Sequence, residues 1–258
     1  MRILLLLLAG LLLFPACEKE VIPAPVDGLD TAWYPLAIGS EWIYRVDSIT
    51  LIPAPGVTLF DSVRFEAREI LTDTFTAADG QQWYRGERQE RSTEADPWVF
   101  RQTFLAGFDM ATGRALRQED NIRFTKLILP ARDGRSWDGH AAFDEFRQYP
   151  VGPELLDIYA NWDYRMDSVD QPAALPTGSQ FDRTLFVQQA KTDGLIDLRH
   201  ASETYAYGVG RIRREWELLH TQCRICCNND TGTCLDLPWR AKAEKGFIIR
   251  EYLVSFTP

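Results

Sequence analysis

EWIYRVDSI, at Glu41–Ile49, carries the clearest structural pattern in the chain. Trp42, Tyr44 and Val46 alternate there with polar or charged residues. A period of two among aromatic and β-branched residues is typical of a strand with one buried face and one solvated face. The segment therefore predicts a half-buried β-strand whose Trp42 and Tyr44 side chains face the core.

Similar segments recur at a spacing of roughly 12–20 residues, and no long helical stripe appears. The predicted strands are Val57–Leu71, Gln82–Arg91, Trp98–Phe108, Asn121–Leu129, Gln180–Lys191, Arg211–His220 and Gly246–Phe256. Leu155–Val169 is expected to be a strand with a possible short helix at its start, and Ile196–Tyr207 fits either element. The sequence predicts a mainly β fold with few short helices. We expect one antiparallel sheet, strongly curved into a barrel or half-barrel.

The N-terminus has the features of a bacterial lipoprotein leader. Ile3–Leu13 is an apolar run of eleven residues, too short for the ~20 residues that span a bilayer as a helix. Residues 1–16 are therefore expected to be a signal peptide. Phe14–Cys17 resembles a lipobox, although Phe14 and Pro15 depart from the usual residues. Cleavage before Cys17 would leave this cysteine as the lipidated residue; the alternative is an ordinary secretory signal beside an incidental cysteine.

The rest of the chain divides into a tether and one folded domain. Residues 17–31 contain two prolines and few core residues, which predicts a lipidated cysteine followed by an extended tether. Residues 32–258 are expected to form a single β-rich domain, with a cysteine-rich hairpin insert at 221–238. These features predict a lipid-anchored protein of the bacterial cell envelope, in the outer membrane and on either its periplasmic or its surface face.

The charge balance argues against nucleic acid as a partner. The full chain has a formal net charge of −9 at pH 7, from 28 Lys and Arg against 37 Asp and Glu. Loss of the leader removes one Arg, so the mature charge is 27 − 37 = −10. Nucleic-acid binding needs a basic patch to neutralise phosphates. The acidic excess is expected to favour solubility instead.

Four closely spaced cysteines near the C-terminus form the sharpest local motif: Cys223, Cys226, Cys227 and Cys234. Outside the cytoplasm such a set favours two disulfides. A bond between the adjacent Cys226 and Cys227 is strained, which leaves two of the three pairings. Of these, Cys223–Cys227 with Cys226–Cys234 is preferred because it closes longer loops, and Cys223–Cys226 with Cys227–Cys234 stays open.

A zinc site made of the same four cysteines is the alternative. Structural zinc takes four thiolates in a tetrahedron, commonly from two short chelating pairs. Only one C-x-x-C pair is present, at Cys223 and Cys226, and an oxidising compartment removes thiolates. We therefore expect disulfides rather than a metal, and no cofactor.

The sequence shows no recognisable catalytic motif. The three histidines, His140, His200 and His220, lie in no HExxH arrangement, and no serine lies in a GxSxG elbow. Carboxylates are abundant, so a glycosidase pair cannot be located by spacing alone. The expectation is that the protein is not an enzyme.

Three stretches resemble a family of uncharacterised lipoproteins from Bacteroidota. They are YPLAIGSEWIYRVDS at Tyr34–Ser48, NIRFTKLILPARDGRSWDG at Asn121–Gly139 and ETYAYGVGRIRREWE at Glu203–Glu217. The resemblance implies a β-rich fold, similar to the half-barrels of lipoprotein carriers or to lipocalin-like barrels. It implies no activity, and it does not include the cysteine-rich insert.

Together these features predict a binding module of the cell envelope without catalysis. Its curved sheet would present a concave apolar face to an apolar small ligand or to an envelope protein, and its N-terminal lipid would bind the membrane. One alternative is an envelope hydrolase that acts on glycan or lipid. The other is a purely structural interaction module.

Overall fold

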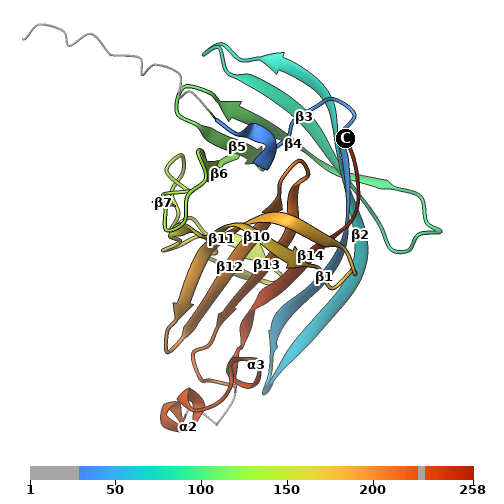
Figure 1. Ribbon diagram of the computed structural model, residues 1–258. Helices are drawn as coiled ribbons and strands as arrows, with labels where there is room; N and C mark the ends of the chain where they lie inside the picture. Colours follow the sequence, from blue (N-terminus) through green and yellow to red (C-terminus); the bar gives the residue numbers. More distant parts are fainter. Residues whose placement is uncertain (1–28, 226–229) are drawn as a thin grey trace, which may run out of the picture.

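A computed structural model describes residues 29–225 and 230–258 (Figure 1). The expected signal peptide, the lipidation site at Cys17, most of the tether, Cys226 and Cys227 lie outside the described residues. In the described part the chain is mostly β-structure, arranged as a nearly closed, barrel-like antiparallel sheet of 12 strands. The predicted fold class is thereby confirmed.

The chain enters through a single turn of 3-10 helix, η2 (Thr31–Trp33). Six consecutive strands then form a meander, here called the first meander: β1 (Glu41–Ala54), β2 (Val57–Thr76), β3 (Gln82–Arg91), β4 (Val99–Asp109), β5 (Arg114–Glu119) and β6 (Ile122–Ile128). Each of these strands pairs with the next one along the chain, so short turns set the antiparallel order.

The second meander completes the sheet. It contains β7 (Ser136–Trp137), β10 (Tyr164–Ala174), β11 (Gln180–Asp193), β12 (Asp197–Ala206), β13 (Gly210–His220) and β14 (Lys245–Thr257). Between β7 and β10, the strands β8 (Tyr149–Val151) and β9 (Glu154–Leu156) form a separate two-stranded hairpin. Strand β14 pairs with β1, so the strands that come first and last along the chain lie side by side in the middle of the sheet.

The two meanders curve around a common interior, with β3–β6 on one side and β10–β14 on the other (Figure 1). The sheet stays open between β6 and β7, which are consecutive in the chain. Two hydrogen bonds cross this gap: Thr125 N donates to Gly139 O at 3.0 Å, and Trp137 Nε1 donates to Thr125 O at 2.8 Å. These bonds supply partners to an edge strand whose backbone would otherwise face solvent.

The alternation predicted for Glu41–Ile49 is observed. Trp42, Tyr44 and Val46 are buried, and the residues between them are partly exposed. Ile196–Tyr207, which fitted a helix or a strand, forms strand β12. Leu155–Val169 contains only the end of β9 and the start of β10. Strand β5 was not predicted, because Arg114–Glu119 is short and mostly polar.

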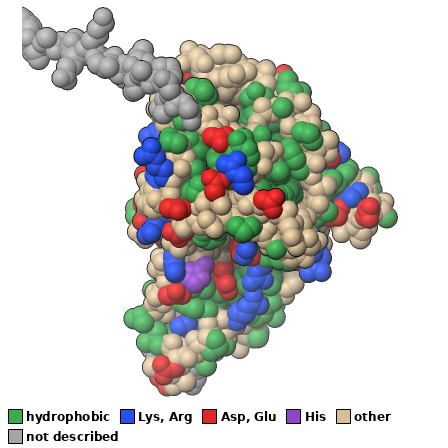
Figure 2. Space-filling model, viewed as in Figure 1, with side chains coloured by type: hydrophobic (Ala, Val, Ile, Leu, Met, Phe, Trp, Pro, Cys, Tyr) green, Lys and Arg blue, Asp and Glu red, His purple; other side chains and the backbone are tan. Residues whose placement is uncertain are grey.

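The described residues contain only two short α-helices, α2 (Thr231–Leu235) and α3 (Trp239–Lys242), both between β13 and β14. Neither approaches the length that a membrane-spanning helix needs. They lie at one end of the barrel, beyond the ends of β13 and β14 (Figure 1). On the face shown in Figure 2, basic and acidic side chains are interspersed rather than gathered by sign, as is typical of a solvated surface.

Candidate functional site

The barrel interior holds a large set of ionisable side chains, here called the buried ion network. Each exposes at most 16% of its side chain. The members are Glu69, Arg88, Arg117, Glu119, Lys126, Glu203, Arg211, Arg214 and Glu251. They come from β2, β3, β5, β6, β12, β13 and β14, so the network joins the two meanders across the interior.

Strand geometry places these charges inside. Glu69 lies between Ala67 and Leu71 on the inward face of β2, and all three are buried. On β13 the register against β12 shifts between Arg211 and Arg213, which leaves Ile212 as an extra residue. Such a bulge re-aims the following side chains. As a result both Arg211 and Arg214 are buried, although a regular strand would send them to opposite faces.

Glu69 is the centre of the network on the side of the first meander. Arg117 binds its carboxylate through two parallel hydrogen bonds, of 2.9 Å from Nη1 and 3.0 Å from Nη2. Arg88 Nη1 and Arg211 Nη2 each donate to Glu69 Oε1 at 3.2 Å. A bidentate pair of this kind is among the stronger hydrogen-bonded contacts in proteins. Three guanidinium groups from three different strands therefore converge on one carboxylate.

Glu203 plays the corresponding part on the side of the second meander. Lys126 Nζ and Arg214 Nε donate to its Oε1, at 2.8 and 2.9 Å. Gln189 Nε2 and the Tyr205 hydroxyl donate to Oε2, at 3.0 and 2.7 Å. Because Lys126 comes from β6 and the other partners from β11–β13, this carboxylate ties the edge of the first meander to the second.

A third carboxylate, Glu251 on β14, links these two centres. Arg88 Nη2 donates to its Oε1 at 2.9 Å, and Arg211 Nη2 lies 3.1 Å from Oε2. Arg214 Nη1 lies 3.5 Å from the same Oε2. Buried charges are tolerated only when they are paired in this way.

The charges set each other's protonation. Burial raises the pKa of the Glu69 carboxyl, but attraction to Arg117 and Arg211 outweighs burial and holds that pKa well below its usual range. The pKa of Glu203 is lowered in the same way by Lys126 and Arg214, against the effect of burial. The carboxylates therefore stay ionised at neutral pH.

Lys126 is the one cation of the network whose pKa is lowered. Burial lowers its pKa to about 8, and attraction to Glu203 offsets only part of this effect. Its ammonium group is therefore charged at neutral pH but loses its proton under mildly alkaline conditions.

A cavity of about 50 Å³ lies beside the network. A cavity needs roughly 10–15 Å³ of such space for each water molecule, so this one could hold a few waters or one small polyatomic group. Its lining combines aromatic, apolar and cationic side chains: Tyr34, Pro35, Leu36, Trp42, Tyr44, Glu69, Leu71, Phe104, Ala106, Arg117, Lys126, Tyr205, Gly210, Arg211 and Arg214.

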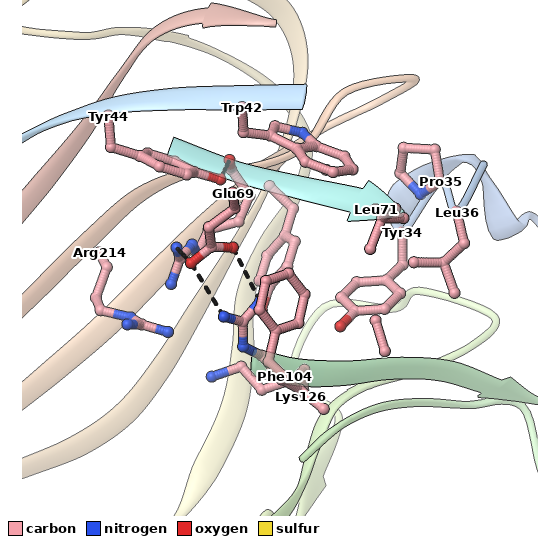
Figure 3. A pocket seen from close by; sticks show the side chains of 15 residues that line it. Tyr34, Pro35, Leu36, Trp42, Tyr44, Glu69, Leu71, Phe104, Lys126 and Arg214 are labelled. Carbon is pink, nitrogen blue, oxygen red and sulfur yellow. Dashed lines mark hydrogen bonds and ion pairs between the residues drawn. The ribbon is translucent and has the colours of Figure 1, made fainter. Parts of the chain in front are cut away.

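The two ends of the cavity differ in chemistry. Figure 3 shows Arg214 and Lys126 extending toward one end, with Glu69 beside them, and Tyr34, Pro35 and Leu36 at the other. These last three residues are only partly buried, whereas the other lining residues are buried. The cavity therefore has an apolar mouth and a charged inner end. The interior is not the uniformly apolar face that the strand pattern led us to expect, because charged residues occupy several inward positions.

Two guanidinium groups at the inner end have N–H donors without an acceptor. Arg211 Nη1 and Arg214 Nη2 are buried and have no hydrogen-bond partner. Arg211 Nη1 has a carboxylate oxygen of Glu203 at 3.8 Å, outside hydrogen-bond distance. A buried donor without an acceptor costs about 1–3 kcal/mol. The inner end can therefore accept a group that supplies oxygen acceptors.

The cysteine motif lies away from this cavity, between β13 and β14. The structure joins Cys223 to Cys234, with their Cα atoms 5.8 Å apart. Both pairings that the sequence left open are therefore wrong for these two cysteines, and their disulfide uses two of the four thiols that the alternative zinc site would need. No other group of metal-ligating side chains occurs within residues 29–225 and 230–258.

The path of the insert explains the pairing. The Glu244 carboxylate accepts hydrogen bonds from the backbone N–H groups of Gln222 and Ile225, both at 2.9 Å, which curls this loop around it. The Asp230 carboxylate caps the start of α2, which carries Cys234. Loop length alone could not show that these two local structures bring Cys223 and Cys234 together.

The histidines are dispersed. His140 is buried in a cluster of aromatic rings near the β6–β7 gap, whereas His200 contacts Asp193 and His220 contacts Asp197 on β12. The structure does not bring the three histidines into one site.

Sequence reasoning missed every member of the buried ion network. The available signal was the alternation of inward and outward positions along each strand. Glu69, Lys126 and Glu203 fall at positions where the alternation places core residues. A charged residue at such a position must find a partner inside the fold. Most of the cavity lining nevertheless comes from the three stretches that carry the family resemblance.

No family model matches the sequence, and no curated protein matches it. The structure is similar to a protein from Bacteroides fragilis described as a "putative exported protein with YmcC-like fold", with a TM-score of 0.43 and 10% identity over 87% of this chain and 98% of that chain. It is also similar to a "putative lipoprotein" from Parabacteroides distasonis, with a TM-score of 0.31, the same identity and the same coverage. No residue role or activity is carried over from either.

Proposed function

We propose that this protein is a lipid-anchored binding module of the cell envelope, which holds a small ligand in the cavity of its barrel and catalyses no reaction. The observation that carries the proposal is the inner end of the cavity, where Arg211 and Arg214 keep buried N–H donors without hydrogen-bond acceptors. Leaving such donors unmatched destabilises the fold. A bound ligand with acceptor atoms would remove that cost.

The protonation of the interior supports binding over hydrolysis. A hydrolase that uses paired carboxyl groups needs one of them protonated, which requires a raised pKa. In the described part of the chain, each Asp or Glu with a perturbed pKa has it lowered, including Glu69, Glu203 and Glu251. These side chains are suited to holding arginines in place rather than to donating a proton.

The location rests on the leader sequence. Cleavage before Cys17 and acylation of its thiol would anchor the chain in the envelope, with each buried methylene of the acyl chains contributing roughly 0.8 kcal/mol. We place the protein in the outer membrane. Metabolic labelling with palmitate should mark the wild-type chain and not the Cys17→Ala variant. Labelling of that variant would show that another residue carries the lipid.

Calorimetric titration of the full-length protein in lipid nanodiscs tests the binding function, with empty nanodiscs as the blank. The probes are octanoate, 1-octanol and inorganic phosphate. Ala106→Leu fills the cavity from β4 and should weaken binding of any probe at least about tenfold, since the added side chain takes the space that the inner part of the probe would occupy. Ala174→Leu, on an exposed position of β10, is the matched control. Failure of every probe to bind, or equal binding to both variants, would count against the proposal.

A further inference from the structure

We propose that the cavity selects an organic monocarboxylate, with the carboxylate held between Arg211, Arg214 and Lys126 at the inner end and the apolar part directed to the mouth, through which a chain of more than a few carbons would extend out of the cavity. This inference rests on the proposed binding function and names the chemical class of the ligand. Three independent features of the described residues support it: the charge balance, the free donors and the polarity of the lining.

The charge balance favours a single negative charge. The network contains five cations, Arg88, Arg117, Lys126, Arg211 and Arg214, against four carboxylates, Glu69, Glu119, Glu203 and Glu251. Glu90 at the rim also contacts Arg88, but it is shared with the exposed Arg101. The interior therefore carries one positive charge in excess. A monoanion would neutralise this charge, whereas the dianion that makes up part of inorganic phosphate at pH 7 would reverse it.

The free donors suit the two oxygens of a carboxylate. Arg211 Nη1 and Arg214 Nη2 are both unpartnered, and both residues line the cavity. Guanidinium groups present planar pairs of N–H donors that match the geometry of carboxylates. Lys126 lines the same cavity and adds a third positive group beside them. The carboxylates that face these cations are Glu203, Glu251 and Glu69, of which Glu69 also lines the cavity, and they keep the guanidinium groups oriented without using all of their donors.

The rest of the lining suits an apolar group. Leu71 on β2 and Phe104 and Ala106 on β4 are buried beside the cavity, and Leu36 lies at its mouth. Burial of apolar surface contributes about 25 cal/mol per Å², so a hydrocarbon tail gains affinity there that a bare anion does not. The direction of the tail follows from Figure 3, in which the apolar mouth and the cationic end lie on opposite sides.

The test compares ligands that differ in one property. For the full-length protein in nanodiscs at pH 7, octanoate should bind about ten- to a hundredfold more tightly than 1-octanol, which is the range expected for hydrogen bonds to a charged group. Octanoate should also bind more tightly than inorganic phosphate. Acetate separates two sources of the same carboxylate chemistry: binding weaker than octanoate identifies an amphiphile, and equal binding identifies a short organic acid.

The matched variants are Arg214→Gln and Arg213→Gln. Arg213 is the neighbouring residue on β13, partly exposed, and contacts Glu215 outside the cavity. Arg214→Gln should weaken octanoate binding about tenfold or more and leave 1-octanol unchanged, whereas Arg213→Gln should change neither. Arg214→Lys restores a cation and should recover part of the preference, which separates a charge effect from misfolding.

The outcomes distinguish the two proposals. If 1-octanol binds as tightly as octanoate and Ala106→Leu abolishes both, the binding function stands and the carboxylate inference is wrong. Tighter binding of phosphate than of octanoate would also overturn the inference. If no probe binds the wild-type protein, the unpartnered donors are met by water alone and both proposals fail.

Discussion

Two regions of the barrel interior bury titratable side chains in opposite ways. In the buried ion network, Glu69 and Glu203 stay ionised because several cations lie within hydrogen-bond distance of each carboxylate. In the aromatic cluster near the β6–β7 gap, His140 is surrounded by rings, and among the described residues its imidazole contacts the Tyr164 hydroxyl, 3.3 Å from Nε2, rather than a carboxylate. The ring centroids of Phe143, Tyr159 and Trp162 lie 4.8, 5.0 and 5.2 Å from that of His140.

The consequence for His140 is loss of its charge. Burial, and to a smaller degree repulsion from Lys126, lower the pKa of its imidazole to about 4. The comparison teaches that burial alone does not decide protonation. The carboxylates are as buried as the histidine, but their partners outweigh the cost of removing the charge from water.

The largest expected effect comes from removing one partner in the network. Glu69→Gln leaves the buried guanidinium groups of Arg117 and Arg211 without their shared carboxylate, and should lower the free energy of unfolding by about 3–5 kcal/mol. Glu66→Gln, on the same strand and paired with the partly exposed Arg91, should cost less than about 1 kcal/mol. Urea denaturation followed by circular dichroism measures both, and equal losses would mean that the network is not cooperative.

The aromatic cluster should respond to pH at higher values than the network, whose carboxylates have lowered pKa values and affect stability only as the glutamates of the unfolded chain protonate, near pH 4.5. The pKa of His140 lies near 6.5 in the unfolded chain and about 4 in the fold. Between these values the unfolded state binds more protons, so His140 should lower the free energy of unfolding by about 2 kcal/mol as pH drops from 6.5 to 5, a range in which the glutamates are still largely ionised. His140→Phe keeps a ring in the cluster and should remove most of the dependence above pH 5, leaving that of the carboxylates below it. A slope that survives in this variant would assign it to other groups.

Lys126 connects the two regions and should show a dependence at alkaline pH. Its pKa is about 8 in the fold and 10.5 in the unfolded chain. Between these values the unfolded state holds the extra proton, so the free energy of unfolding should rise as pH increases from 8 to 9, below the range in which the tyrosines of the unfolded chain ionise. Lys126→Met should remove this rise. Titration of the native protein, which measures the release of the Lys126 proton, would check the sign of the pKa shift independently.

The smallest expected effect concerns the gap beside the aromatic cluster. Trp137→Phe removes the hydrogen bond from Nε1 to Thr125 O and should lower the free energy of unfolding by about 1–2 kcal/mol. Trp98→Phe, on the loop side of β4, should cost less than about 0.5 kcal/mol because its ring lies over Arg68 and Arg91 at the surface. Similar losses in the two variants would show that the bond across the gap adds nothing.

Local patterns were sufficient to predict most of the strands. Gln82–Arg91 is observed with the predicted bounds. The candidate site could not be predicted in the same way. Arg211 and Arg214 both face inward only because β13 carries an extra residue against β12. Their spacing in the sequence does not indicate a bulge.

By itself the sequence determined the mainly β class, the antiparallel order of neighbouring strands and the inward face of β1. These depend on residues close together in the chain, where alternation and turn residues act directly. Only the tertiary structure decided which charges meet: Glu69 reaches Arg211 across 142 positions, and Cys223 meets Cys234 through a curled loop. Such contacts depend on how far the sheet curves and on its register, and neither quantity is present in any single segment.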